Sequence, residues 1–342
     1  MVSIKMIAEK CNVSVATVSK ALNDHQDIGE ETKKRIRETA SEMGYFPNAA
    51  ARMLKTKRSN SIGVLFEEEA GSGLTHEYFS GVLNGLKMQV EQQGYDLTFI
   101  NTSYQRNRNR MSYLDHVKYR NFDGVVIVCC EDFEAPEVQE LMRSRIPVVT
   151  VDYVHQNCTA VLSNNVKGME ELIRYICGQG HRSIAYIHGQ SSSYVTKERL
   201  AAYYKTMDDL GLQVPEEYVR EANYLETKGA AQHTEALLAL KNPPTCILYP
   251  DDTALIGGRN VLAERGIRIP EEISVAGYDG TRMSQLLYPK LTTIRQNTEK
   301  IGREAALRLI QFIEKPKTAF VERVVIDGEL LTGQSVGKVT SS

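Results

Sequence analysis

The chain has 342 residues, a length that predicts two or three folded domains. With 42% hydrophobic residues, 25% charged residues and a formal net charge of −2, its composition excludes a largely disordered protein and favours an ordinary globular one. The charge is unevenly distributed, because residues 1–58 carry a net charge of +4 and the remainder −6. The N-terminal end is therefore the place to look for nucleic-acid binding.

The cysteines and the N-terminus indicate the compartment. Six cysteines lie without C-x-x-C spacing, mostly in apolar runs, so we expect reduced core thiols rather than disulfides or a zinc site. Residues 1–5 lack the apolar core of a signal peptide, and no run approaches the roughly 18 apolar residues needed to span a bilayer. We expect a cytoplasmic protein with no metal and no cofactor. The cysteines are Cys11, Cys129, Cys130, Cys158, Cys177 and Cys246.

Residues 1–46 contain no strand-like run, and their apolar residues recur at helical spacing in three short segments. This pattern predicts an all-α domain. Asn12 tolerates a left-handed turn between the first two helices, and Ser14 can cap the second. Gly44 and Pro47 end the third helix. The first two helices fit a helix-turn-helix, although they also fit a plain helical hairpin.

The second helix and the segment after the third carry the candidate DNA contacts. Side chains on the exposed face of the second helix can contact thymine methyls, bases and phosphates. Residues 47–60 include NAAARMLKTKRSN, which is too short to be a stable isolated helix, so we expect a conditional helix or linker. The exposed residues of the second helix are Val15, Ala16, Thr17, Ser19 and Lys20.

From Ser61 onward, strand-like apolar runs alternate with helical stretches closed by glycine. Continuous apolar strands joined by helices predict parallel sheets covered on both faces. The number of strands exceeds that of one six-stranded sheet, so we expect two doubly wound subdomains in an α/β body, with a ligand site at the carboxyl ends of the strands. The predicted strands are 62–66, 95–101, 124–130, 147–152, 183–189, 245–249 and 273–279.

The segments IKMIAEKCNVSVATVSKALN and ETKKRIRETASEMGYFPNAAARMLKTKRSNSIGV resemble the lactose-repressor/galactose-repressor (LacI/GalR) family of transcription regulators. The resemblance continues through GHRSIAYIHG, ERLAAYYKTM and ISVAGYDGTRMSQLLYPKLTTIRQ to about residue 315. It implies a DNA-binding domain (1–46), a hinge helix or linker (47–60) and a body similar to periplasmic sugar-binding proteins. The implied subdomains of that body are 61–162 with 293–321, and 163–292 with 322–342.

The resemblance also implies which residues touch DNA. Val15, Ala16 and Lys20 match base-reading positions in the major groove, whereas Thr17 and Ser19 match phosphate contacts. Leu54 matches a leucine that wedges into the minor groove, a device that bends DNA. Lys20 departs from the family's usual arginine or histidine, so the preferred half-site stays open. The full set of expected DNA-binding residues is Ser14, Val15, Ala16, Thr17, Ser19, Lys20, Asn48, Arg52, Leu54 and Lys55.

In the body, the resemblance implies an effector site. Arg199 offers a planar set of donors for hydroxyls or a carboxylate, and Asp279 offers two acceptors, although a surface ion pair and a turn residue are the respective alternatives. Asp251 is expected to place a second carboxylate in the pocket, which favours hydroxyl-rich or cationic effectors over phosphates. The expected effector-binding residues are Asp152, Arg199, Tyr224, Asp251 and Asp279, with His76, Tyr78 and Phe79 on the opposite lip.

These expectations combine into a repressor that binds a palindromic operator as a homodimer under the control of a small polar effector, which we expect to be a sugar. We expect no catalytic residues, because the sequence contains no Walker lysine motif, no G-x-S-x-G and no H-E-x-x-H. The alternative is a sugar-binding module for transport or sensing, which would need an export or anchoring signal.

Overall fold

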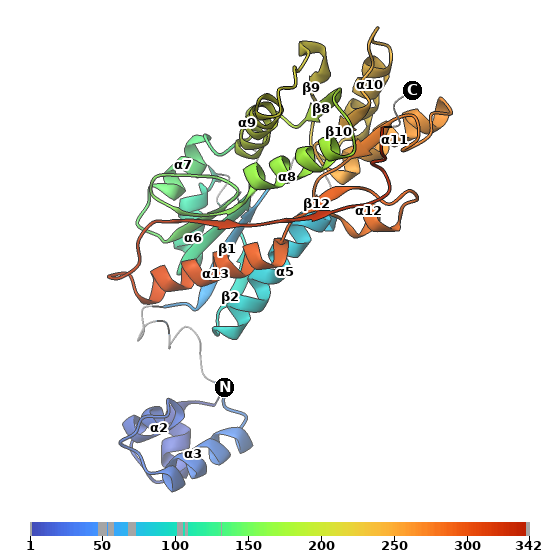
Figure 1. The fold of residues 1–342 in the computed structure, drawn as a ribbon. Helices are drawn as coiled ribbons and strands as arrows, with labels where there is room; N and C mark the ends of the chain where they lie inside the picture. The colour runs from blue at the N-terminus through green and yellow to red at the C-terminus, as the bar shows by residue number, and fades with distance from the viewer. Residues whose placement is uncertain are drawn as a thin grey trace. The chain divides into compact units, whose positions relative to one another are not determined.

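The computed structural model describes residues 2–46, 53, 58–67, 73–100, 105–106, 109–130 and 132–339. The chain divides into two compact units, Met1–Ser59 and Asn60–Ser342 (Figure 1). No helix in these described ranges is both long and apolar enough to cross a membrane. The hinge residues expected to contact DNA, Asn48, Arg52, Leu54 and Lys55, lie outside the described residues.

The first unit is a small helical domain formed by α1 (Ile4–Lys10), α2 (Val15–Leu22) and α3 (Glu30–Glu42). Asn12 has a φ of 51°, and the Ser14 Oγ accepts a hydrogen bond from the Thr17 N–H at 3.0 Å, as the sequence predicted. Gly44, with a φ of 68°, follows α3 and ends it. Apolar residues from all three helices form the core, among them Ile7, Val18 and Ile36.

The first subdomain of the second unit is built on a six-stranded parallel sheet of order β13-β7-β6-β5-β1-β2. Helices α5 and α13 bury one face of this sheet, and α6 and α7 bury the other. The strands are β1 (Ser61–Phe66), β2 (Asp96–Phe99), β5 (Gly124–Cys129), β6 (Val148–Val151), β7 (Thr159–Ser163) and β13 (Arg323–Ile326). The helices are α5 (Glu77–Gln92), α6 (Tyr113–Arg120), α7 (Pro136–Met142) and α13 (Thr298–Glu314).

The second subdomain repeats this plan on a four-stranded parallel sheet of order β11-β10-β8-β9. Helices α8 and α9 cover one face, and α10 and α11 cover the other. Its strands are β8 (Ile184–His188), β9 (Val219–Glu221), β10 (Cys246–Leu248) and β11 (Ser274–Ala276). Its helices are α8 (Asn165–Gly178), α9 (Tyr194–Asp209), α10 (Thr227–Leu238) and α11 (Asp252–Glu264). The remaining elements in the described ranges are two short 3₁₀ helices, one α-helix and four short strands: η1 (Gly73–Thr75), η2 (Glu216–Tyr218), α12 (Arg282–Leu286), β3 (Gln105–Arg106), β4 (Asn109–Arg110), β12 (Thr293–Arg295) and β14 (Glu329–Leu331).

All seven predicted strands form within these sheets, which confirms the doubly wound α/β architecture. The structure corrects the expected subdomain boundaries in two places. Residues 323–326 were assigned to the second subdomain, yet β13 pairs with β7 of the first sheet. Residues 293–295 were assigned to the first subdomain, yet β12 pairs with β14 and places Ile294 in the core of the second subdomain. These strands are short and pair with distant segments, so apolar periodicity alone did not locate their partners.

Helices α5 and α13 lie side by side over the first sheet (Figure 1). They are in backbone contact, because a Cβ on Gly302 would lie 1.9 Å from the Val82 carbonyl oxygen. Only glycine permits this approach. The first turn of α5, with Tyr78 and Phe79, and Gln296, which precedes α13, line the cavity described next.

Candidate functional site

A cavity of about 480 Å³ opens where strands of both sheets end. Its lining follows the carboxyl ends of β5, β6, β8, β9 and β11, the edge at which open α/β sheets bind ligands. Four of the five expected effector residues line it: Asp152, Arg199, Tyr224 and Asp279. The opposite lip carries His76, Tyr78 and Phe79, as the sequence predicted.

Arg199, in the second turn of α9, is the cation of the described cavity lining and is 3% exposed, which excludes the alternative of a surface ion pair. Its Nε donates to the Asn165 Oδ1 at 2.9 Å, and its Nη1 donates to the Pro250 carbonyl oxygen at 3.0 Å. The guanidinium carbon lies 3.5 Å from the centre of the Tyr278 ring. No described residue accepts a hydrogen bond from Nη2, so this nitrogen keeps donors for a ligand.

Asp279 faces the cavity at the end of a hydrogen-bonded chain between the crossover segments. The Gln296 Nε2 donates to the Asp279 Oδ1 at 2.6 Å, and the Ser163 Oγ donates to the Gln296 Oε1 at 2.6 Å. Ser163 ends β7, and Gln296 follows β12. These hydrogen bonds therefore connect both subdomains to the carboxylate of Asp279. Its other oxygen, Oδ2, accepts from no described residue.

Asp152 follows β6 and is held from two sides. Its Oδ1 accepts from the Ser163 N–H at 2.7 Å, and its Oδ2 accepts from the Tyr78 hydroxyl. Burial raises the pKa of Asp152 above its ordinary value, although both hydrogen bonds oppose the shift. Burial and the neighbouring carboxylate raise the pKa of Tyr78 well above its usual value, so its hydroxyl stays a donor at neutral pH.

Tyr224 provides an aromatic wall. Its hydroxyl hydrogen-bonds with the Thr196 Oγ1 at 2.8 Å, and its ring lies against Gly189. A Cβ at Gly189 would lie 2.1 Å from the ring, so a side chain there would displace it. Phe79 and Phe133 add further aromatic surface to the lining.

Three residues of the lining have left-handed backbone conformations. The φ angles are 51° at Asp152, 63° at Leu225 and 101° at Asp279. Each such conformation costs roughly 1–3 kcal/mol and persists where surrounding contacts enforce it, commonly at functional sites. Their convergence on one cavity strengthens its assignment as the ligand site.

The structure corrects the expected position of Asp251. This residue caps α11: its Oδ1 accepts from the Ala254 N–H at 2.7 Å and its Oδ2 from the Leu225 N–H at 2.8 Å. It is 1% exposed and is absent from the described cavity lining. Burial, reinforced by the negative charge of Asp279, raises the pKa of Asp251 to about 7. Asp251 therefore supports the strained Leu225 and adds no second carboxylate to the wall.

Sequence reasoning missed several polar residues of the lining. Each of them follows a strand or precedes a helix, and that position is the only signal that could have identified them. Ser193, for example, is the N-cap residue of α9. The missed residues are Gln190, Ser193, Asn223, Glu226 and Gln296.

In the first unit, the residues in and before α2 that the sequence predicts to contact DNA lie outside the apolar core. Val18 and Ala21 are buried against the core, which turns the opposite side of the helix outward. Val15 is 49% exposed although it is apolar, and Lys20 forms an ion pair with Asp27. Ser14 and Ala16 are also exposed, while Thr17 and Ser19 are half-buried.

Comparisons with known proteins agree with both units. Residues 3–48 match the bacterial regulatory proteins of the lacI family, and residues 173–336 match the periplasmic binding protein-like domain. The chain is 31% identical over 343 residues to the probable HTH-type transcriptional repressor ExuR of Bacillus subtilis, covering 100% of both chains. It is 30% identical to the HTH-type transcriptional repressor PurR of Vibrio campbellii, covering 92% of each.

Solved structures share the fold over nearly the whole chain. The lac repressor dimer bound to operator and the anti-inducer ONPF superposes with a TM-score of 0.83 at 23% identity, covering 98% of this chain and 99% of that one. The complex of the transcriptional regulator CelR with cellobiose gives a TM-score of 0.69 at 22% identity, covering 98% and 100%. Because the full-length relatives are repressors rather than enzymes or transport proteins, the transport alternative is not favoured. The chain belongs to the LacI family of helix-turn-helix transcriptional repressors.

Proposed function

We propose that this repressor binds its operator as a homodimer through α2, and that a neutral, hydroxyl-rich molecule of the sugar class in the cavity controls this binding. The observation that carries the proposal is the convergence of Arg199, Asp152, Asp279 and Tyr224 on one cavity. The effector roles of these residues are part of the proposal.

The charge of the described cavity lining disfavours an anionic ligand. Among the described residues, Asp152, Asp279 and Glu226 line it against one cation, Arg199, so a phosphorylated effector would meet net repulsion from this part of the lining. Sugar hydroxyls can donate to the carboxylates and accept from the Arg199 Nη2. Aromatic rings such as Tyr224 suit the apolar face of a pyranose. The volume of about 480 Å³ lies within the usual range for small-molecule pockets.

Related structures support the partners that we propose. The lac repressor was solved as a dimer on operator DNA, CelR with cellobiose, and an Enterococcus faecium relative with ribose. For this chain we assign base contacts to Val15, Ala16 and Lys20 of α2. Ser14, Thr17 and Ser19 would contact phosphates, and a two-fold dimer would require a near-palindromic operator.

A thermal-shift screen of neutral sugars, sugar phosphates and nucleobases on the full chain tests the effector class. A ligand present at 100 times its dissociation constant should stabilise the protein by about 2.7 kcal/mol. We expect neutral sugars to raise the melting temperature and phosphorylated ones to have no effect. Stabilisation by a sugar phosphate or a nucleobase alone would contradict the assignment.

The DNA-binding part is tested by selecting duplexes from a random pool with the wild-type chain. The enriched sequence should be near-palindromic, and sedimentation should show a dimer. The sugar found in the screen should then change the affinity for that duplex. A monomer, or an affinity that the sugar leaves unchanged, would contradict the proposal.

A further inference from the structure

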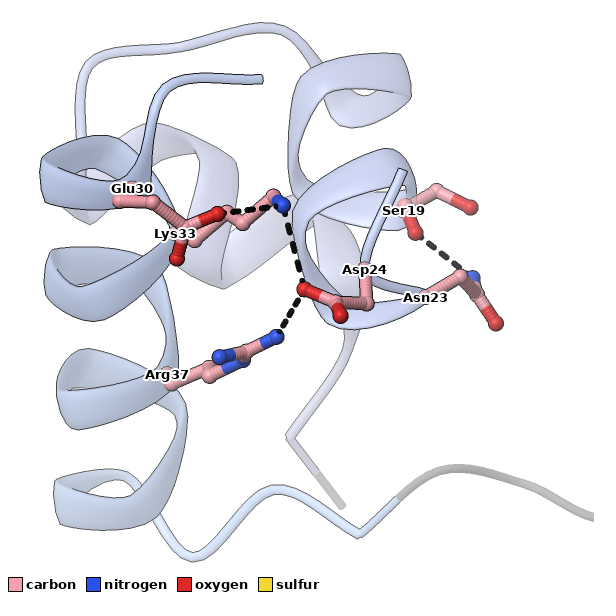
Figure 2. Close-up of polar contacts among 6 residues, drawn as sticks. All are labelled: Ser19, Asn23, Asp24, Glu30, Lys33 and Arg37. Carbon is pink, nitrogen blue, oxygen red and sulfur yellow. Dashed lines mark hydrogen bonds and ion pairs between the residues drawn. The ribbon is translucent and has the colours of Figure 1, made fainter. Parts of the chain in front are cut away.

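Asp24, in the turn after α2, and three charged side chains of α3 form a group that connects the two helices (Figure 2). The Asp24 Oδ1 accepts a hydrogen bond from the Arg37 Nη2 at 2.6 Å and lies 3.2 Å from the Lys33 Nζ. The Lys33 Nζ also donates to the Glu30 Oε1 at 2.7 Å. We call Asp24, Lys33 and Arg37 the turn cluster.

Asp24 occupies a position that local preferences disfavour. Its φ is 58°, and the hydrogen bonds from the Asp24 N–H to the Ala21 carbonyl and from the His25 N–H to the Lys20 carbonyl place it just beyond the end of α2. Glycine or asparagine is usual there, and a carboxylate is unfavourable beside the negative end of a helix dipole. Local helix-ending chemistry therefore does not account for an aspartate at this position.

Lys33 gives a physical reason for a carboxylate at position 24. Its residue surface is 4% exposed, and a buried ammonium group needs charged or hydrogen-bonding partners. Asp24 and Glu30 are the two carboxylates within ion-pair distance among the described residues. Glu30 lies on α3 itself, so Asp24 is the partner that comes from the end of α2.

The ion pairs of the turn cluster fix the orientation of the end of α2 relative to α3, because each depends on the direction of its donor and acceptor. Lys33 and Arg37 are four residues apart and thus lie on one side of α3. Asp24 bridges both, as Figure 2 shows, whereas Asn23 bonds only back to the Ser19 carbonyl within α2. Among the described residues, the core that α2 and α3 share is apolar, with Val18 and Ile36 as members, and apolar contacts have no directional preference.

We propose that Asp24 is a positioning residue for DNA recognition, which through Lys33 and Arg37 sets the orientation of α2 on α3. It thereby determines where the base-reading side chains of α2 meet the major groove. This inference rests on the proposed role of α2 as the recognition helix. Asp24 itself need not contact DNA.

A purely electrostatic role for Asp24 predicts the opposite result. Asp24 carries a negative charge on the unit that binds a polyanion, so removing the charge should strengthen binding to every duplex. Loss of a positioning contact should instead weaken binding to the preferred sequence and leave random DNA bound as well as before or more tightly. The ratio of the two affinities separates these accounts.

The test uses the full chain and the duplex that the wild type enriches from a random pool, together with a scrambled duplex. Asp24→Asn removes the charge but keeps a residue that tolerates a left-handed φ. Glu38→Gln is the matched control: it removes the same charge from α3, where Lys34 of the same helix, at 4.0 Å, is the ion-pair partner of Glu38 among the described residues. Fluorescence anisotropy at one fixed salt concentration gives all dissociation constants.

We expect Asp24→Asn to weaken binding to the enriched duplex about ten-fold, the scale of one misread base pair, with no loss on the scrambled duplex. Glu38→Gln should leave the ratio unchanged. Arg37→Gln should lower the ratio of the two affinities by a similar factor, on top of a loss on both duplexes from the removed positive charge, and adding Asp24→Asn to it should change the ratio little further. If circular dichroism shows that Asp24→Asn unfolds the helices, Arg37→Gln, whose side chain is 48% exposed, carries the prediction for the affinity ratio.

An unchanged affinity ratio in a folded Asp24→Asn or Arg37→Gln variant would overturn the inference, as would an equal loss on both duplexes. If the wild type enriches no sequence, the recognition role of α2 is wrong and this inference falls with it. If the wild type enriches a sequence and the variants read it equally well, only the positioning role is wrong.

Discussion

Replacing Arg199 with lysine tests the effector site while keeping its positive charge. The guanidinium uses Nε for Asn165 and Nη1 for Pro250, and retains Nη2 for a ligand. A lysine has one nitrogen and cannot serve these three directions at once. The variant also loses the flat stacking surface on the Tyr278 ring, which lies 3.5 Å from the guanidinium carbon.

The expected loss follows from the contacts that Nη2 would make. A hydrogen bond to a charged group contributes about 1.5–3 kcal/mol. At about 1.4 kcal/mol for each factor of ten, the effector should bind roughly ten- to one-hundred-fold more weakly. Isothermal titration with the sugar that gives the largest thermal shift measures this change directly.

Arg174→Lys provides a matched control, because Arg174 lies on the exposed face of α8 and pairs with Glu170 at 2.8 Å. Its effector affinity should equal that of the wild type. Both variants should bind the enriched duplex normally without effector, since neither residue belongs to the first unit. An Arg199→Lys variant within two-fold of the wild type in effector affinity would show that Arg199 does not contact the ligand.

Three further predictions concern other parts of the molecule. Gly189→Ala should push the Tyr224 ring off the cavity wall. Because aromatic contacts contribute about 0.5–1.5 kcal/mol, titration should show effector binding weakened by up to about ten-fold. An unchanged affinity would place the ligand elsewhere. Burial and the charge of Asp279 raise the pKa of Asp252 to about 7, above the unfolded value. The stability that this raised pKa contributes is therefore full below about pH 4 and is lost as pH rises through 7. Between about pH 4 and 7, the free energy of unfolding of the wild type in urea should fall by about 1.4 kcal/mol per pH unit relative to that of Asp252→Asn. Parallel pH profiles of the two proteins would contradict this. Ser14→Ala removes the cap of α2 and should destabilise this helix by about 1 kcal/mol, seen as roughly five-fold faster hydrogen exchange at the Thr17 amide; equal exchange rates would show that the cap contributes nothing.

Local signals predicted what depends on local chemistry. Asn12 and Ser14 sit at a turn and a helix start, where single residues decide the backbone, and the structure has both features as expected. Asp251 shows the limit: it immediately precedes α11, so the rules for helix starts already favoured a cap, yet the resemblance suggested a pocket residue. The role of Gln296 depends on a contact with Ser163 across 133 positions, which no local pattern encodes.

The pairing of β13 with β7 has a consequence for synthesis of the chain. The two partners are separated by the whole second subdomain, and at 5–20 residues per second the ribosome needs roughly 10–30 s to make the intervening residues. During that interval β7 forms an open sheet edge in the nascent first subdomain, while the second subdomain can already assemble its own sheet. The first subdomain therefore waits for β13 although most of it is translated first, and the unpaired edge of β7 is where a stalled or shortened chain would recruit chaperones or aggregate.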